Sequence, residues 1–419
     1  MSRLAVVLVL AALLGAVDAA AAVPEHRIGV RVVAGDGEFF DRRSGAKFVP
    51  RGSTYLRRGW RDVGGGRVIS HQATFDVGVY DAAAAEAALA AMRAQHYNVV
   101  KVFLDAACVR TCLGDATTAL LSFDYLTNVL DFLRRARANG LQVVLAIDEP
   151  PWGTTWNAQV GAPFHGFNTW YLTRAGVEGF NAFWRTFAAT LAALRAPLDT
   201  VWAYELGGET WFQAEREPLS RRSGTVTTAN GLTYDLSDAT QRTEMLAAGL
   251  AYFTERVRTA IRSVDPTALV TMGFIAPTLP HPWRRGDTRV ALPLAALERT
   301  PLDFVDLHVY PGWDLPLPRF AENVGLRRST KPIVVGELGA YHFAFPTVAA
   351  AASGLASWQA ESCAYGVDGW LLWTWDTPTP VAPRMWSAAA ENGHLAQALG
   401  PRARPDPCAP PATLSPEAP

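Results

Sequence analysis

Two glutamates in the sequence each close a run of apolar residues. Glu209 follows WAYELGG (202–208), and Glu337 follows PIVVG (332–336). If both runs are strands of one parallel sheet, both carboxyl groups lie at the same edge of it and face one another. One carboxyl could then protonate a leaving oxygen while the other attacks the carbon or directs water to it, which is the chemistry of glycosidic bond cleavage. Mutual repulsion would raise the pKa of one carboxyl and keep it protonated as the acid.

Other polar residues occupy similar places in neighbouring runs. Glu205 and Asp306 share the inward parity, and we interpret both as structural, with Glu205 paired to Arg51 or Lys101. The pair Asp148-Glu149 ends the run LQVVLAI (141–147), where it could bind a sugar hydroxyl or only cap the following loop.

The chain contains 14 tryptophans, and several follow predicted strand ends. Aromatic rings suit sugars because the C–H faces of a sugar stack on them, whereas a purely structural role in the core is equally compatible with each tryptophan. Three tryptophans are substrate-binding candidates by position alone: Trp152, Trp211 and Trp313.

The elements that must position these residues alternate between strand and helix. Predicted strands begin near 48, 98, 141, 200, 268, 304, 332 and 369, and seven intervening segments have helical spacing or room for a helix. Buried parallel strands alternating with helices predict an α/β fold, a single (β/α)₈ barrel, with active-site residues at the strand ends. A doubly wound sheet is the alternative, but Gly64–Gly66 lacks the spacing of a phosphate-binding turn.

Additional segments surround the predicted barrel. An N-terminal hairpin is expected over Ile28–Phe40 and Lys47–Tyr55, with its turn at Asp41–Gly45. Strand 268–275 is expected to be continuous. Excess length falls in three long loops over the active face, at 57–80, 149–177 and 212–239.

The two ends of the chain differ from its middle. Arg3, the apolar core Leu4–Val17 and small residues through Ala22 have the pattern of a secretory signal peptide, too short in its core to span a bilayer. The pattern predicts a secreted or periplasmic protein with no transmembrane segment once residues 1–22 are removed. Residues 401–419 are rich in proline, so we expect one domain over 23–400 followed by a tail.

Cysteine usage agrees with export. An even number of cysteines in an exported chain predicts disulfides, here Cys108–Cys112 and Cys363–Cys408, the second of which would attach the tail to the last helices. A zinc site is the alternative, and it is disfavoured because no histidine pair lies near either cysteine pair.

Composition excludes several classes of function. A hydrophobic content of 49% with 18% charged residues excludes a disordered chain, and a net charge of −1 argues against nucleic-acid binding. The sequence contains no G-x-S-x-G, H-E-x-x-H or P-loop motif. We therefore expect no metal and no cofactor. The paired glutamates and the tryptophans predict a carbohydrate ligand, and we expect a monomer.

The ordered set of strand motifs resembles the clan A glycoside hydrolases, most closely family 5, the cellulases, mannanases and their relatives. The resemblance runs from about 48 to 376 through RGSTYL (51–56), YNVVKVFL (97–104), WAYELGGETW (202–211), FVDLHVYP (304–311), KPIVVGELGAY (331–341) and GWLLWTWD (369–376).

This resemblance implies a role for each matching residue. Glu209 matches the acid/base and Glu337 the nucleophile of a retaining mechanism. His308 and Tyr310 match the residues that position them. Trp373 or Trp375 matches the aromatic platform beneath the sugar.

The chain departs from the family pattern at three positions. Gly208 stands where asparagine normally binds the sugar 2-hydroxyl, Lys101 stands where arginine lies near the nucleophile, and Asp148 stands where histidine ends the third strand. Lysine is a point charge without the bidentate fork of arginine. These departures favour a divergent glycosidase, and they leave open a sugar-binding barrel that has lost catalysis. A third reading is a barrel hydrolase with a single catalytic carboxylate or an inverting route.

Overall fold

The computed structural model describes residues 25–63, 66–70, 72–106, 113–114, 118–151, 154–160, 166–275, 289–376 and 384–411. The predicted signal peptide, the end of the tail, Cys108, Cys112 and Trp152 lie outside these residues. Within them, no helix has both the length and the apolar character needed to cross a membrane.

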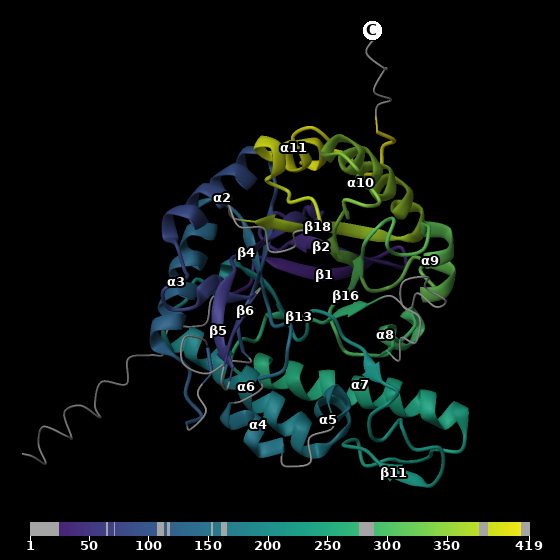
Figure 1. Ribbon diagram of the computed structural model, residues 1–419. Helices are drawn as coiled ribbons and strands as arrows, with labels where there is room; N and C mark the ends of the chain where they lie inside the picture. Colours follow the sequence, from purple (N-terminus) through teal and green to yellow (C-terminus); the bar gives the residue numbers. More distant parts are fainter. Residues whose placement is uncertain are drawn as a thin grey trace, which may run out of the picture.

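The centre of the molecule is a parallel sheet that closes into a barrel (Figure 1). Its strands are β4 (Arg51–Leu56), β7 (Val99–Phe103), β8 (Gln142–Ala146), β9 (Val201–Glu205), β13 (Leu269–Thr271), β14 (Gly273–Ile275), β16 (Val305–Val309), β17 (Ile333–Leu338) and β18 (Val367–Asp376). Their order is β13-β9-β8-β7-β4-β18-β17-β16-β14. Because β13 and β14 are consecutive parts of one interrupted strand, the two ends of this sheet meet there and the barrel has eight strand positions.

The fifth strand of the barrel is therefore interrupted, whereas the sequence predicts a continuous strand over 268–275. The break lies at Met272, so that β13 pairs with β9 while β14 pairs with β16. Gly273 explains the break, since a Cβ there would lie 2.1 Å from the carbonyl oxygen of Gly208 and 2.7 Å from Nε2 of His308. The backbone comes this close because buried side chains fill the barrel at that level.

Helices surround the barrel in a ring (Figure 1). They are α2 (Ala82–Ala94), α3 (Phe123–Ala138), α4 (Thr155–Val160), α5 (Phe167–Leu172), α6 (Arg174–Ala193), α7 (Ala239–Arg262), α8 (Leu294–Glu298), α9 (Leu317–Val324), α10 (Val348–Ser362) and α11 (Ala390–Leu399). Their starts follow ordinary capping chemistry. For example, the Asp81 carboxylate accepts the backbone N–H groups of Ala83 and Ala84 at the start of α2.

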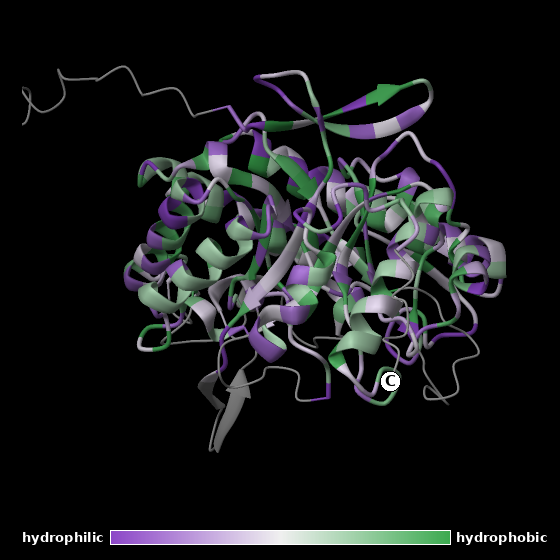
Figure 2. Ribbon diagram, turned by 90° about the horizontal axis from the view of Figure 1, so that it is seen from above, coloured by the Kyte–Doolittle hydropathy of each residue, from purple (hydrophilic) through white to green (hydrophobic). Residues whose placement is uncertain are grey.

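The N-terminal sheet closes one end of the barrel (Figure 2). It consists of β1 (Ile28–Val33), β2 (Asp36–Asp41) and β3 (Lys47–Phe48). The sequence predicts one strand over 28–40, but the chain reverses at Ala34–Gly35, which have φ angles of 53° and 93°. Alanine at such a turn gives little sequence signal, because asparagine or glycine is usual there.

The three segments expected as long loops carry structure of their own. The first contains the hairpin β5 (Gly59–Val63) and β6 (Gly66–Ser70), and the second contains α4 and α5. The third contains β10 (Phe212–Gln213), which pairs with β15 (Arg289–Val290), and the hairpin β11 (Thr225–Thr227) and β12 (Thr233–Asp235). All three follow the carboxyl ends of barrel strands, as predicted.

The tail is attached to the barrel as far as it is described. The predicted disulfide Cys363–Cys408 is confirmed. Arg51 donates hydrogen bonds to the carbonyl oxygens of Leu399 and Arg404, at 2.5 and 3.1 Å. Arg51 therefore serves the tail, which leaves Lys101 as the partner of Glu205.

Candidate active site

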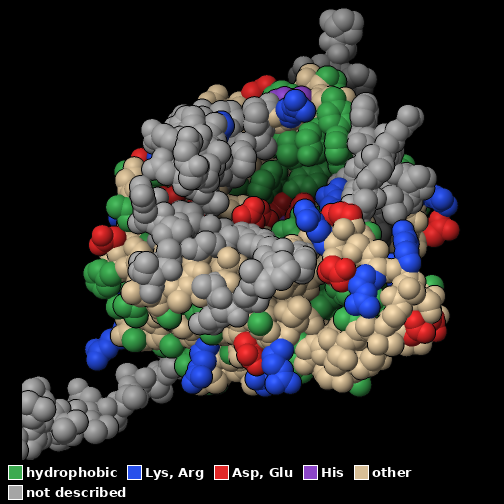
Figure 3. Space-filling view, turned by 60° about the horizontal axis from the view of Figure 1, so that its bottom comes forward, with side chains coloured by type: hydrophobic (Ala, Val, Ile, Leu, Met, Phe, Trp, Pro, Cys, Tyr) green, Lys and Arg blue, Asp and Glu red, His purple; other side chains and the backbone are tan. Residues whose placement is uncertain are grey.

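The candidate site lies in a hollow at the carboxyl ends of the barrel strands. Figure 3 shows this hollow with acidic side chains at the bottom and a hydrophobic wall beside them. Glu337 is supplied by β17, His308 by β16 and Lys101 by β7. Glu209 differs from the sequence prediction, because β9 ends at Glu205 and Glu209 lies four residues beyond it.

The two candidate catalytic carboxyl groups lie close together. One oxygen of Glu209, one ring nitrogen of His308 and one oxygen of Glu337 lie within 4.8 Å of one another. The surroundings of the two glutamates differ, since 31% of the Glu209 side chain is exposed but only 4% of the Glu337 side chain. One carboxyl can therefore exchange protons with water, while the other is held in place.

Glu337 faces the interior because β17 is irregular. The register with β16 passes from Leu307↔Val335 to His308↔Glu337, so Gly336 is an extra residue in the pairing. Val335 packs in the outer core cluster, and strict alternation would turn Glu337 outward as well. The sequence interpretation assumed regular strands. Its inward orientation of Glu337 is correct only because the bulge at Gly336 shifts the alternation by one residue.

Asp306 holds the bulge. The backbone N–H of Gly336 donates to Asp306 Oδ1 at 2.8 Å, and a Cβ on Gly336 would lie 2.1 Å from the same oxygen. The interpretation of Asp306 as structural is thus supported, and the structure adds that this carboxylate positions Glu337.

A buried network surrounds Glu337. Its carboxylate accepts a short hydrogen bond from the Tyr310 hydroxyl, and Nζ of Lys101 lies 3.5 Å from its Oε1. Burial and the nearby charge of Glu209 raise the pKa of Glu337, whereas Lys101 and Tyr310 oppose this increase. Burial, Glu337 and Glu209 also raise the pKa of the Tyr310 hydroxyl, which keeps this hydrogen-bond donor protonated.

The ammonium of Lys101 lies at the centre of this network. It donates to Glu205 Oε1 at 2.7 Å, which agrees with the predicted pairing of Glu205. Burial alone would lower the pKa of Lys101, but the charges of Glu205, Glu337 and Asp306 outweigh it and raise that pKa above its usual value. Burial raises the pKa of Glu205 well above its usual range despite the opposing charge of Lys101.

His308 links the network to both glutamates. Burial and the charge of Lys101 lower its pKa well below the usual value, so the ring is neutral. Nζ of Lys101 lies 3.3 Å from Nε2, and an ammonium can only donate, which places the ring proton on Nδ1. That nitrogen lies 3.3 Å from Glu337 Oε2 and 3.6 Å from Glu209 Oε1, so the N–H faces the reacting groups.

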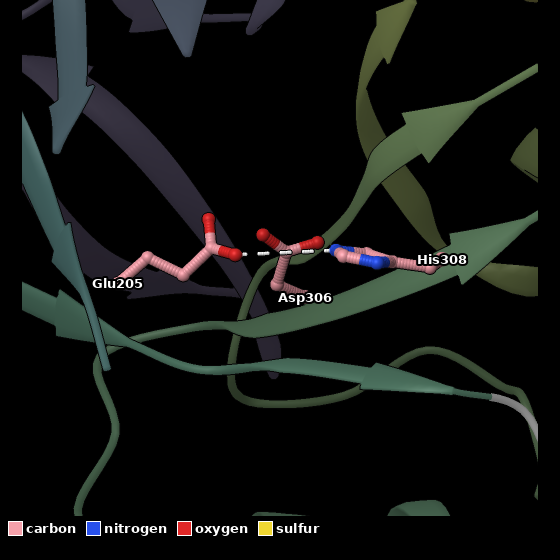
Figure 4. A group of neighbouring side chains, drawn as sticks. All are labelled: Glu205, Asp306 and His308. Atoms are coloured by element: carbon pink, nitrogen blue, oxygen red, sulfur yellow. Dashed lines mark ion pairs between the residues drawn. The ribbon is translucent and has the colours of Figure 1, made fainter. Parts of the chain in front are cut away.

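Among the residues that the structure describes, two groups of side chains have the composition of metal ligands. One is Glu205, Asp306 and His308, which approach one another from β9 and β16 (Figure 4), with Glu205 Oε1 3.9 Å from His308 Nε2. The other is Glu209, His308 and Glu337. Nζ of Lys101 already brings a positive charge to the shared histidine, and its repulsion disfavours a metal ion in either group.

The tryptophan candidates separate by location. Trp373 is half-buried beside the inner cluster and contacts Phe103 edge-on, with ring centroids 6.2 Å apart. Trp375 packs in the outer core and is only 9% exposed, which leaves Trp373 as the inner of the two. The register shift between β18 and β4 across residues 372–375 accompanies this change of side.

Trp211 and Trp313 lie in separate aromatic groups. The Trp211 ring contacts Phe167 edge-on, with centroids 5.0 Å apart, and the guanidinium of Arg289 lies over it. Trp313 packs on Tyr341, with ring centroids 5.2 Å apart, and Tyr341 in turn contacts Tyr310. The second group therefore reaches the network around Glu337 through Tyr341. The sequence analysis missed Tyr341 because one aromatic residue in a loop has no distinctive spacing.

The carboxylate of Asp148 fills the space that a side chain at position 208 would need. A Cβ on Gly208 would lie 2.6 Å from Asp148 Oδ1 and 2.9 Å from the Phe103 ring. The Asp148 Oδ2 atom accepts a hydrogen bond from the side-chain amide of Gln72 at 2.5 Å. Burial and the charge of Glu209 raise the pKa of Asp148 to about 6. The sequence analysis treated these two departures separately, and Gln72 was missed altogether.

Comparison with known proteins places the fold. No family model and no curated protein sequence matches the chain. An endo-1,4-β-mannanase from Rhizomucor miehei aligns with 90% of this chain and 99% of its own, with a TM-score of 0.60 and 14% identity. An endo-β-1,4-mannanase from Thermotoga petrophila aligns with 86% of this chain and 77% of its own (TM-score 0.55, 14% identity). An endocellulase from Pyrococcus horikoshii aligns with 89% and 99% (TM-score 0.54, 15% identity).

The chain therefore has the fold of the clan A, family 5 glycoside hydrolases, as its motifs suggest. At these identities the likeness concerns the fold, so the chemistry depends on the residues of the site.

Proposed function

We propose that the protein is a retaining β-glycoside hydrolase that cleaves O-glycosidic bonds of an oligosaccharide or polysaccharide. The observation that carries this proposal is the pair Glu209 and Glu337, with oxygens within 4.8 Å of one another around His308. Retaining enzymes place their carboxyl groups about 5–5.5 Å apart, whereas inverting enzymes leave room for a water molecule between them. The same spacing argues against a hydrolase with one catalytic carboxylate.

The difference in exposure assigns the two roles. Glu209, which is partly exposed, protonates the leaving oxygen while buried Glu337 attacks the anomeric carbon and forms a glycosyl ester. Glu209, now a carboxylate, then takes a proton from water, and that water breaks the ester with net retention of configuration. The hydroxyl of Tyr310 donates a hydrogen bond to Glu337 and keeps its carboxylate in position for the attack, and Nδ1 of His308 faces the same carboxylate from 3.3 Å.

The electrostatics are consistent with one proton shared by the two glutamates. A negative charge on Glu209 raises the pKa of Glu337, so a proton on Glu209 favours the charged form of Glu337. The Lys101 ammonium adds to this effect from 3.5 Å. Trp373, at the inner wall, is the proposed sugar platform, and Trp313 and Trp211 are proposed contacts farther along a bound chain.

Export is part of the proposal. The apolar opening of the sequence and the disulfide Cys363–Cys408 both fit an oxidising compartment outside the cytoplasm.

The test is the Glu337→Gln variant assayed on a panel of aryl β-glycosides and glycans, with the anomer of each product resolved. We expect wild-type turnover with retention, and loss of turnover in a folded variant that still binds sugar. Activity close to wild type in Glu337→Gln, or an inverted first product, would contradict the assignment.

A sugar-binding barrel without catalysis is the second candidate. It is favoured by Gly208 and Lys101, which stand where the family pattern has asparagine and arginine. A 2-deoxy-2-fluoro glycoside distinguishes the two functions, since it would label Glu337 covalently in a retaining enzyme and leave a binding protein unmodified.

A further inference from the structure

We propose that Asp148 determines specificity, accepting a hydrogen bond from a hydroxyl or ammonium group on the sugar carbon next to the reacting one. This inference rests on the proposed function, because it takes the reacting carbon to lie between Glu209 and Glu337. It goes beyond that function by naming the substituent that the site selects.

The position of Asp148 follows from adjacent strands. Asp148 lies two residues beyond β8, and Glu209 lies beyond β9, the neighbouring strand of the barrel. Its Oδ1 lies 2.6 Å from the Cβ position of Gly208, the residue directly before Glu209. The charge of Glu209 raises the pKa of Asp148, as expected for two carboxyl groups that lie close together.

One oxygen of Asp148 is held and the other is available. Oδ2 accepts the Gln72 amide at 2.5 Å, whereas Oδ1 has no hydrogen-bond partner among the residues that the structure describes. The Asp148 side chain is only partly buried, so Oδ1 is accessible to a ligand. An acceptor that is fixed on one side and accessible on the other is suited to a ligand.

The surroundings orient Oδ1 toward the sugar ring. The Phe103 ring lies 2.9 Å from the Cβ position of Gly208, and Phe103 also contacts Trp373, the proposed platform. Asp148 therefore lies on the side of the hollow that would hold a ring resting on Trp373. The reacting carbon of a pyranose is bonded to the ring oxygen and to C2, so the nearest substituent able to donate a hydrogen bond is the one on C2.

A carboxylate imposes a definite selection on that substituent. An ionised carboxylate only accepts hydrogen bonds, so it suits a hydroxyl or ammonium group and leaves an acetamido carbonyl without a donor. An added acetamido group must also fit beside a carboxylate that already fills the space above Gly208. A site built around a buried polar partner discriminates strongly against ligands that lack the matching group.

The test compares wild type, Asp148→Ala and Asp148→Asn on 4-nitrophenyl β-glucosides and β-mannosides. Each series includes the 2-hydroxy, 2-deoxy, 2-amino-2-deoxy and 2-acetamido-2-deoxy forms. We expect wild type to favour 2-hydroxy or 2-amino substrates over 2-deoxy in kcat/KM, and Asp148→Ala to reduce that ratio about 10- to 100-fold. The 2-amino form separates an ammonium preference from a hydroxyl preference. Asp368→Asn, which changes a partly buried carboxylate at the opposite end of the barrel, is the matched control and should leave the ratio unchanged.

A double-mutant cycle tests the shared space directly. Gly208→Ala alone should reduce the same ratio, because its Cβ would displace the Asp148 carboxylate. The same change in the Asp148→Ala background should have little further effect. Circular dichroism and thermal melting of each variant identify any loss of folding.

Failure of the proposed function is distinguished by measuring binding. If wild type hydrolyses nothing, calorimetric titration of cellobiose, mannobiose and their 2-deoxy analogues still shows whether Asp148→Ala lowers the preference for the 2-hydroxyl. An unchanged ratio in both kcat/KM and binding would overturn the inference about Asp148 while leaving the glycosidase proposal intact.

Discussion

The two ends of the barrel interior are built from the same strands and have opposite character. At the end closed by the N-terminal sheet, Trp202 stacks on Phe304 with ring centroids 5.1 Å apart, and Phe39 meets both rings edge-on. Three or four residues farther along, Glu205 and His308 join a buried network of charges.

The comparison shows that side chains only one layer apart in the barrel interior have different roles: one layer stabilises the fold and the next carries the candidate catalytic groups. The aromatic layer, Trp202, Phe304 and Phe39, gains free energy from apolar burial and ring packing. The charged layer is formed by Lys101, Glu205, His308 and Glu337. In it, two buried polar atoms, Glu205 Oε2 and His308 Nδ1, have no hydrogen-bond partner within the part of the chain that the structure describes. Such atoms cost stability, and at a functional site they are available for the reaction.

The largest expected effect lies in the charged layer. Glu337→Gln should lower turnover by at least about 1000-fold, because the nucleophile is lost. It should leave the free energy of unfolding unchanged or slightly increased, since an amide is easier to bury than a carboxylate. Initial rates and urea unfolding measure the two quantities. A marked loss of stability would show that the charged layer also holds the fold together.

The reciprocal experiment is Trp202→Ala in the aromatic layer. Removing this buried ring should lower the free energy of unfolding by about 3–5 kcal/mol. The kcat of the molecules that remain folded should stay within a few-fold of wild type. A selective loss of kcat at full folding would mean that the two layers are coupled.

A smaller effect on stability is expected when the buried pair Lys101 and Glu205 is replaced one residue at a time. Lys101→Met should cost about 1–3 kcal/mol, because Glu205 loses its partner and takes up a proton instead. Adding Glu205→Leu should restore that stability, because two buried charges are replaced by apolar groups. Neither variant should recover activity, since Glu337 lacks its ammonium in both. Recovery of activity in the double variant would contradict the role given to Lys101.

The smallest effects are expected from two aspartates, one at each end of the barrel. Burial raises the pKa of both Asp148 and Asp368 to about 6, from an ordinary value of 3.8. Asp368 lies at the start of β18 and accepts the backbone N–H of Ile333. Between about pH 4 and 6 the folded protein therefore binds more protons than the unfolded chain, so this contribution to stability falls as pH rises through that range.

Asparagine at either position should flatten the decline in stability between pH 4 and 6, as measured by urea unfolding at several pH values. Only Asp148→Asn should also change the pH profile of kcat/KM near pH 6. A change in that profile in Asp368→Asn would remove the distinction between the two ends.

The sequence predicts the barrel well because its strong signals are local. Apolar runs such as LQVVLAI (141–147) and the segments of helical spacing between them mark the elements, and their alternation predicts the parallel sheet. The break at Met272 was not predictable in this way, because it depends on side chains that other strands bring close to Gly273.

The candidate site likewise has features that the sequence predicts and features that depend on contacts between strands. Glu337, His308 and Lys101 were predicted from strand position and resemblance, and the structure brings them together. The bulge at Gly336 and its support by Asp306 could not be predicted, since strict alternation gives no sign of an extra residue. Similarly, Trp373 and Trp375 were not distinguishable until the irregularity in β18 placed them on opposite sides of the sheet.

The contact between Gly208 and Asp148 has a consequence for the history of this site. A side chain at 208 would displace the carboxylate at 148 from its present position, since the Cβ atom would lie 2.6 Å from Asp148 Oδ1. In a lineage that began with asparagine at 208, aspartate at 148 could adopt this position only after, or together with, the loss of that side chain. Relatives of this chain should therefore change at both positions together, and a relative with aspartate at 148 should carry glycine at 208.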